Sequence, residues 1–239
     1  MKNDHSRIKE LFVASGQRFE SEDLALGGEH RLTIYFFRHA SLALLWDGFL
    51  VYVDPIAEYA DYSRLPKADL VLVTHEHYDH LDVKAVEALR GGETVVVGSP
   101  AAAGEMVGAE ALPHGRVREV ADGVSVESVP AYNVSPHQLQ FHPRERGDNG
   151  YVVAFGPTRV YIAGDTEPTP EMGRLGKIDI AFIPVNQPYT MTLEQAAGAV
   201  RIIKPGIFFP YHTTDTDIVK IVPMLADVPS VSVRIHEMP

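Results

Sequence analysis

The 239-residue chain contains no cysteine, which excludes disulfide bonds and leaves no thiolate to bind a metal ion. It also has no apolar run near the roughly 18 residues that a membrane span needs. The first ten residues are polar and lack the apolar core of a signal peptide, so we expect a soluble, cytoplasmic protein.

The chain also has no excess of positive charge. Its 21 Lys and Arg are outnumbered by 32 Asp and Glu, which gives a formal net charge of -11. Nucleic acid phosphates favour basic surfaces, so this balance argues against a nucleic acid partner. The same balance is also ordinary solubility charge. Two divalent cations would offset four of the negative charges, and a pocket that held them could be locally positive and suit an anionic small molecule.

Short apolar runs alternate with helix-like runs, as in α/β proteins. Strands are predicted over residues 31–37, 41–46, 49–53, 70–73, 94–98, 124–129, 150–155, 159–163, 178–184, 206–209 and 231–236. Helices are predicted over 81–89, 101–106, 192–203 and 217–225, after a short amphipathic helix that carries Ile8, Leu11 and Phe12. Two sets of strands with helices predict a layered α/β/β/α arrangement.

Turn and cap signals divide the chain further. Thr192 and Gln195 have the spacing of a capping box at the start of the helix over 192–203. Residues 136–149 are polar and rich in turn residues, which predicts a long loop of a kind that is often functional. No linker or repeat is visible. We therefore expect an N-terminal extension over residues 1–30, with a Gly27-Gly28 loop, and a single domain over residues 31–239.

The strongest chemical signal is the run Thr74-His75-Glu76-His77-Tyr78-Asp79-His80, which directly follows an apolar strand-like run. Neutral imidazoles and a carboxylate are ligands that zinc prefers. Side chains two apart in an extended chain point the same way, so His75 and His77 can reach one ion. Asp79 and His80 can then turn toward a neighbouring ion. Four ligand-type residues at a strand end favour a metal site over a surface loop whose histidines meet only water.

Two later residues also follow predicted strands. Asp165 comes after the strand over 159–163, and His212 comes after the strand over 206–209. Alone, Asp165 would be a turn residue and His212 a partly buried or solvated histidine. Beside the first block, both become candidate metal ligands, because a metal site needs ligands from elsewhere in the fold.

Together these residues resemble, in order and approximate spacing, the motifs of the metallo-β-lactamase superfamily. The resemblance runs from about residue 30 to the end, and Asp54 after the strand over 49–53 resembles the aspartate that braces the metal loop. It implies an α/β fold of the four-layer αββα sandwich type. The segments Arg38-His39-Ala40-Ser41, Ala131-Tyr132-Asn133 and 184–191 resemble the Zn-dependent hydrolases related to L-ascorbate-6-phosphate lactonases and N-acyl-phosphatidylethanolamine phospholipase D.

The resemblance implies two metal sites that share one carboxylate. The ligands would be His75 and His77 for the first ion, Asp79, His80 and His212 for the second, and Asp165 as the bridge. One or two divalent ions, zinc first and manganese or iron as alternatives, would hold a hydroxide as the nucleophile. Asp79 would be the catalytic residue that orients this water or passes a proton to the leaving group.

The chain departs from the family at one ligand. The family usually supplies a third histidine to the first ion after a mid-chain strand, and Asn133, a poor zinc ligand, stands near that place. His137 and His142 lie in the loop beyond it, and either could substitute. We favour His142, because it lies between Phe141 and Pro143 and is nearer the next strand.

Three residues are candidates for substrate contact: His39, Asn133 and Tyr189. His39 follows a strand and could lie near the pocket, or it could be a packing histidine. Tyr189 could meet substrate through its hydroxyl, or it could anchor a loop.

The sequence thus predicts a metal-dependent hydrolase that acts on a lactone, another ester or a phosphodiester. One alternative is a non-catalytic metal-binding or regulatory member of the fold, which the missing mid-chain histidine keeps open. Another is a di-iron oxidoreductase, although such enzymes place glutamate where His77 stands. The oligomeric state, including a homo-oligomer, stays open.

Overall fold

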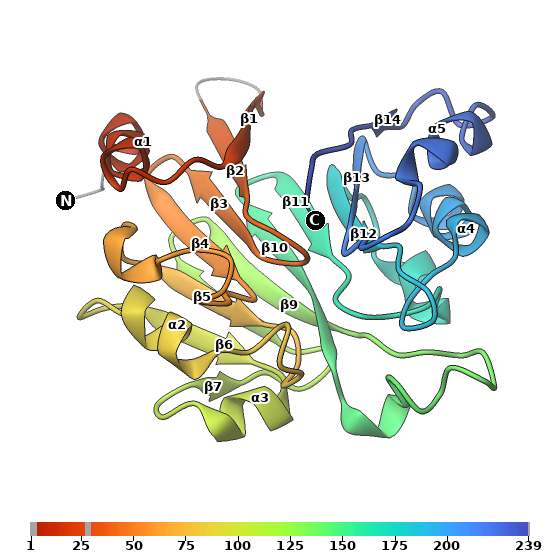
Figure 1. Cartoon of the computed structure of the whole chain (residues 1–239), viewed down its shortest axis with the longest axis horizontal. Helices are drawn as coiled ribbons and strands as arrows, with labels where there is room; N and C mark the ends of the chain where they lie inside the picture. The colour runs from red at the N-terminus through yellow and green to blue at the C-terminus, as the bar shows by residue number, and fades with distance from the viewer. Residues whose placement is uncertain (1–3, 27–29, 239) are drawn as a thin grey trace.

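The computed structural model of the chain describes residues 4–26 and 30–238, so the predicted Gly27-Gly28 loop lies outside the described residues. Two seven-stranded sheets lie between two outer groups of helices (Figure 1). In spatial order the first sheet contains β1 (Glu20–Ala25), β2 (Arg31–Phe36), β3 (Leu42–Trp46), β4 (Phe49–Val53), β5 (Leu70–Val73), β6 (Val95–Gly98) and β7 (Glu110–Ala111). The second contains β14 (Ser232–Val233), β13 (Ile207–Tyr211), β12 (Ile180–Pro184), β11 (Thr158–Ile162), β10 (Asn149–Phe155), β9 (Val124–Pro130) and β8 (Val117–Ala121).

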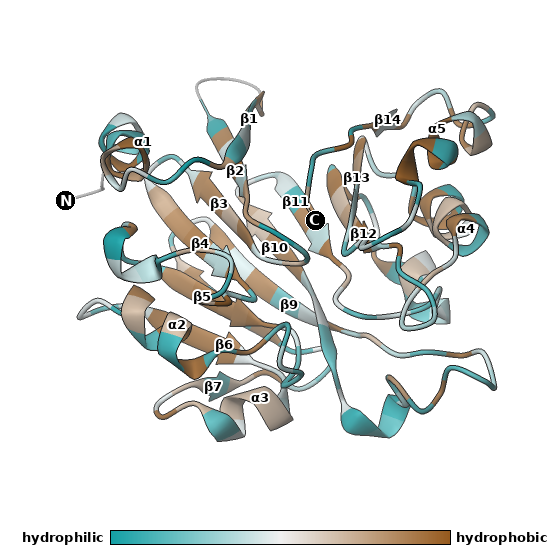
Figure 2. Ribbon diagram, viewed as in Figure 1, coloured by the Kyte–Doolittle hydropathy of each residue, from teal (hydrophilic) through white to brown (hydrophobic). Residues whose placement is uncertain are grey.

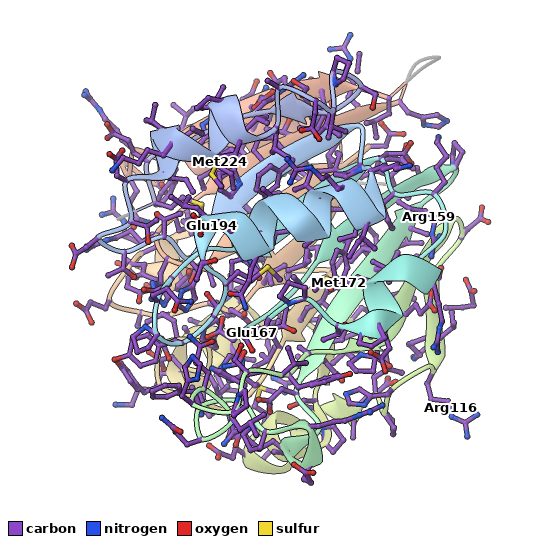
Figure 3. All side chains as sticks on the ribbon, turned by 90° about the vertical axis from the view of Figure 1, so that its right-hand side faces the viewer. Arg116, Arg159, Glu167, Met172, Glu194 and Met224 are labelled. Atoms are coloured by element: carbon purple, nitrogen blue, oxygen red, sulfur yellow. The ribbon has the colours of Figure 1, made fainter. Side chains whose placement is uncertain are left out.

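Helices cover the outer face of each sheet. The first sheet carries α1 (His5–Ala14), α2 (Val83–Leu89), α3 (Pro100–Glu105) and the 3-10 turn η1 (Tyr62–Arg64). The second carries α4 (Leu193–Ile203), α5 (Ile221–Met224) and the turns η3 (Pro170–Arg174) and η4 (Ile218–Lys220), and η2 (Arg144–Arg146) lies in the loop between β9 and β10. Figure 3 looks onto α4 from outside, with Met172 of η3 beside it.

The two sheets repeat one another in topology. Strands β1 to β4 pair antiparallel and β4 to β7 pair parallel. Likewise β8 to β11 pair antiparallel and β11 to β14 pair parallel. The sequence shows no such repeat by eye. Loops that follow the parallel strands leave from one edge of each sheet, which is where sites form in α/β folds.

Three apolar clusters define four layers. Between the sheets, Phe36 of β2 packs against Phe182 and Phe209, with ring centroids 6.4 and 5.4 Å away. A second cluster lies between the first sheet and α1, α2 and α3, and a third lies between the second sheet and α4 and α5. In Figure 2 interior strands such as β4, β5 and β12 are mostly brown, the hydrophobic end of the scale. The predicted αββα sandwich is confirmed.

The sequence predicted some elements poorly. Strand β1, in the segment expected as an extension, pairs with β2 along its whole length, and α1 buries Ile8 and Phe12 but leaves Leu11 exposed. Strands β1 and β8 were missed because edge strands carry polar residues and lack a clean apolar alternation. The predicted helix over 217–225 consists of two short turns, η4 and α5. The predicted strand over 231–236 pairs only at 232–233, and beyond it His236 meets the Glu20 and Glu22 carboxylates of β1.

Local geometry at two chain reversals follows from the sequence. Thr192 and Gln195 form the predicted capping box of α4, and Lys204 ends the helix in a left-handed conformation before Pro205. Gly164 has a φ of +66°, and a Cβ there would lie 2.6 Å from the carbonyl oxygen of Asn149. Only glycine fits such a position, and this turn presents Asp165. No helix among the described residues is long and apolar enough to cross a membrane.

Candidate metal centre

The predicted ligands leave the ends of strands from both sheets. The run from His75 to His80 follows β5, Asp165 follows β11, His212 follows β13, and His142 lies in the β9–β10 loop. Their ligand atoms form overlapping groups in which all atoms lie within 4.8 Å of one another. The groups are His75, His77 and His142; His75, His80 and Asp165; and His39, Asp79, His80 and His212.

The first group contains the histidine that we favoured as a substitute. His75 Nε2 and His77 Nδ1 lie 3.1 Å apart, and the ring centroid of His142 lies 5.1 Å from that of His75 and 4.8 Å from that of His77. His137 is exposed and belongs to none of the groups. The structure therefore brings His142 to this half of the site, and its role as a ligand stays a prediction.

Asp165 lies between the two halves. Its Oδ1 is 3.3 Å from His80 Nε2, and its Oδ2 is 3.3 Å from both His142 Nε2 and His212 Nε2. Asp79 Oδ2 lies 3.9 Å from His212 Nε2 and 4.0 Å from His80 Nε2. Asp165 thus contacts His142 in the first half of the site and His80 and His212 in the second half, as a shared ligand must.

A test of fit comes from buried polar atoms that lack a hydrogen bond. Among the described residues, His80 Nε2, His212 Nε2 and Asp165 Oδ1 are buried without one, and all three face the same centre. Leaving such a group unpaired costs about 1–3 kcal/mol. A divalent cation of borderline softness would satisfy these imidazole and carboxylate atoms together. The donor set therefore fits a metal ion.

The electrostatics of the centre keep four of these groups, His75, His77, Asp79 and Asp165, in ligand form. Burial lowers the pKa of His77 and moves that of His75 well below its usual range, so both imidazoles are neutral. Burial would raise the pKa of Asp165, but the neighbouring His212 and His80 hold it well below its usual range. Burial would raise the pKa of Asp79, but the hydrogen bond from His39 and the nearby His80 and His212 together lower it to about 2. Both carboxylates are therefore ionised at neutral pH.

Asp54 supports the centre from beneath. Its carboxylate accepts hydrogen bonds from the Thr74 N–H and hydroxyl, both at 2.7 Å, and meets His80 Nδ1 at 2.8 Å. Holding Nδ1 in this way turns Nε2 of His80 toward the centre. This is the bracing contact that the family resemblance implies for Asp54.

A second support was missed by the sequence. Asp148 Oδ2 lies 3.3 Å from His142 Nδ1, and Arg146 Nε donates to the same carboxylate at 3.0 Å. Arg146 also donates to Glu76 at 2.6 Å, which ties the loop to the first motif. Although burial opposes it, bonding to Asp148 and Asp165 raises the pKa of His142 to about 9. An aspartate in a polar, turn-rich loop gave no sequence signal for this role.

The backbone around the centre is held in an uncommon conformation. His39, Asp54 and His212 have φ values of 56°, 44° and 50°, in the left-handed region. Such residues cost about 1–2 kcal/mol each and cluster at functional sites. The His212 N–H donates to the His39 carbonyl at 2.9 Å, and the two rings lie 3.6 Å apart. The surrounding contacts therefore fix the positions of both histidines.

A cavity of about 400 Å³ opens over the centre. Of the predicted substrate contacts, His39 and Tyr189 line it and Asn133 does not. Asn133 is 1% exposed, and its Nδ2 donates to the carbonyl oxygens of Tyr189 at 2.7 Å and Gln138 at 3.2 Å. The structure therefore places Asn133 behind the cavity, where it joins two loops.

We expect Asp54→Ala to weaken zinc binding by about 10–100-fold, because His80 loses the contact that orients it. Competition with a chromophoric chelator would measure the affinity of the purified protein. Asp61→Ala, which removes an exposed aspartate that caps η1, is the matched control and should bind zinc as the wild type does. Equal affinity in the Asp54 and Asp61 variants would contradict the bracing role.

Comparison with known proteins gives a consistent result. A family model described as a beta-lactamase superfamily domain matches residues 33–212. A UPF0173 metal-dependent hydrolase from Methanopyrus kandleri is 31% identical over 198 residues, which cover 76% of this chain and 84% of the relative.

Solved structures extend the similarity. A crystal structure of a candidate metal-dependent hydrolase from Parabacteroides distasonis superposes with a TM-score of 0.89 at 44% identity, over 93% of this chain and 100% of the other. Igni18, a metallo hydrolase from Ignicoccus hospitalis, superposes with a TM-score of 0.72 at 23% identity, over 87% and 95% of the two chains. The second similarity is one of fold alone.

Proposed function

The chain belongs to the beta-lactamase superfamily and, within it, to the UPF0173 metal-dependent hydrolases, and from this membership we propose the reaction and the residues that perform it. The proposed reaction is hydrolysis of a lactone, another ester or a phosphodiester. The proposed cofactor is one or two divalent ions, with zinc first and manganese or iron as alternatives. The observation that supports the proposal most is Asp165, buried between two groups of histidines with an unpaired oxygen.

The proposed ligands are His75, His77 and His142 for one ion, Asp79, His80 and His212 for the other, and Asp165 for both. When bound, such ions supply Lewis acidity and a water whose pKa falls toward about 7. Asp79 would accept a hydrogen bond from the attacking water and so orient it. His39 Nε2, 3.1 Å from Asp79 Oδ2, holds that carboxylate in place at the cavity.

Two alternative functions have less support. The missing mid-chain histidine kept a non-catalytic member open, and the proximity of His142 to His75 and His77 argues against it. The di-iron alternative would call for glutamate at position 77, where this chain has an imidazole.

The proposal is tested on protein purified without added metal. We expect mass spectrometry to find one or two zinc, manganese or iron ions per chain. The protein should hydrolyse bis(p-nitrophenyl) phosphate or members of a lactone panel, lose this activity on dialysis against a chelator, and regain it with zinc. Bound metal without hydrolysis of any probe would favour the non-catalytic alternative. Protein that neither binds nor responds to zinc, manganese or iron would overturn the proposal.

A further inference from the structure

Each histidine among the described residues that line the cavity over the centre is either a proposed metal ligand or, as His39, the support of Asp79, so none is left to carry a positive charge toward a substrate. None of the described residues that line the cavity is lysine or arginine. The nearby Arg146 is bonded to Asp148 and Glu76, and the guanidinium of Arg38 lies over the Tyr59 ring, 5.7 Å from its centroid. A negative group away from the scissile bond would therefore meet the Asp79 and Asp165 carboxylates without a side-chain counter-charge.

The cavity is lined instead by aromatic side chains. Tyr78, Phe141 and Tyr189 line the cavity from three loops, those after β5, β9 and β12. The Phe141 and Tyr189 rings pack edge to face, with centroids 4.9 Å apart. The exposed fractions of Tyr78 and Tyr189 are 88% and 46%, which is high for such large side chains. Exposed aromatic surface around a concave site is typical of ligand contact.

The loops that carry Phe141 and Tyr189 are held in place before any ligand binds. The amide of Asn133 donates to the Tyr189 carbonyl. Glu167, fully buried, accepts hydrogen bonds from the Ser135 N–H at 2.6 Å and from Gln195 Nε2 at 2.7 Å, and so ties the β9–β10 loop to the start of α4. Figure 3 shows Glu167 below the end of α4 that carries Glu194. Phe141 and Tyr189, placed by loops that are already fixed, therefore lose little entropy when they bind a flat group.

We infer that the substrate carries an uncharged, apolar group of aromatic size next to the scissile bond, and that Tyr78, Phe141 and Tyr189 bind it. This inference rests on the proposed hydrolytic function and narrows it. The inferred substrate differs from the anionic one that the charge balance suggested. Only the group that reacts at the metal centre would find positive charge to balance a negative charge of its own. Lactones, esters or diesters with aromatic substituents satisfy the inference, whereas substrates with a second anionic group do not.

The test compares three γ-butyrolactones that differ only in the γ-substituent: phenyl, methyl or carboxylate. For the metal-loaded protein we expect kcat/KM for the phenyl compound to exceed that for the methyl compound by about tenfold, with the carboxylate lowest. Tyr189→Ala should remove most of the phenyl preference. Tyr189→Phe should keep it, because the ring and not the hydroxyl makes the contact. Val117→Ala, on the exposed edge strand β8, is the control and should leave all three rates unchanged.

A binding measurement separates this inference from the proposed function. The γ-phenyl lactam, which resists hydrolysis, should bind the metal-free protein about tenfold more tightly than the γ-methyl lactam by calorimetry, and Tyr189→Ala should abolish the difference. If the phenyl lactam binds selectively but no lactone or diester is hydrolysed, the proposed function fails, and what stands is the preference of the cavity for an aromatic group. If lactones are hydrolysed with equal or better kcat/KM for the carboxylate compound, the function holds and the inference is overturned.

Discussion

Replacing Asp165 with alanine is expected to lower kcat/KM for any hydrolysed substrate by about 10³-fold or more, because the shared ligand of both half-sites is lost. Asp165 is 3% exposed and lies 3.3 Å from imidazole nitrogens of His80, His142 and His212. Among the described residues, no other carboxylate contacts both His142, in the first half of the site, and the pair His80 and His212, in the second half. The variant should therefore also bind fewer metal ions per chain.

The measurement pairs kinetics with metal analysis of the same preparation. Asp227→Ala removes an exposed aspartate that pairs with Arg201 far from the centre, and it should keep wild-type kcat/KM and metal content. Circular dichroism would show whether the Asp165 variant is folded, and Asp165→Asn, of the same shape, provides a second variant if it is not. Full activity in a folded Asp165 variant would sink the assignment of a shared ligand and the hydrolytic mechanism built on it.

The interior strands could be predicted from the sequence because a strand that is buried on both faces needs apolar residues at almost every position, and this gives a continuous apolar run. Strands β4 and β5 have the predicted bounds, and both are almost wholly buried. Edge strands carry no such signal, since β8 alternates half-buried and exposed residues and half of the residues of β1 are acidic. Their pairing is decided by the neighbouring strand, which a local pattern does not contain.

The candidate site divides in the same way. The run from His75 to His80 is local, so spacing alone brings out its ligand chemistry. Asp148 and Glu167 carry no comparable signal, because each resembles a solvated carboxylate until the fold supplies its partner. The first sheet contributes the histidine run, and the second contributes Asp165, His212 and the loop with His142. The centre therefore exists only when the two halves pack through their shared apolar layer.

The sharpest test of the loop is the pair of variants His142→Ala and His137→Ala. Both remove a histidine from the β9–β10 loop, but only His142 lies among the candidate ligands, and His137 is exposed. We expect His142→Ala to lower metal affinity at the first site by about 10²-fold or more, with a similar loss of kcat/KM, as removal of one of three imidazoles implies. His137→Ala should match the wild type in both.

We do not expect the neighbouring Asn133 to replace His142 as a metal ligand in the His142→Ala variant. Its side chain lies outside the cavity lining, with its amide nitrogen bonded to the carbonyls of Tyr189 and Gln138, and amide oxygens are weak zinc ligands. Titration with zinc, followed by mass spectrometry of the bound ions, would count the sites in each variant. Equal metal content in both histidine variants would mean that another group completes the first site. In that case the contact between His142 and Asp148 would serve only to hold the loop.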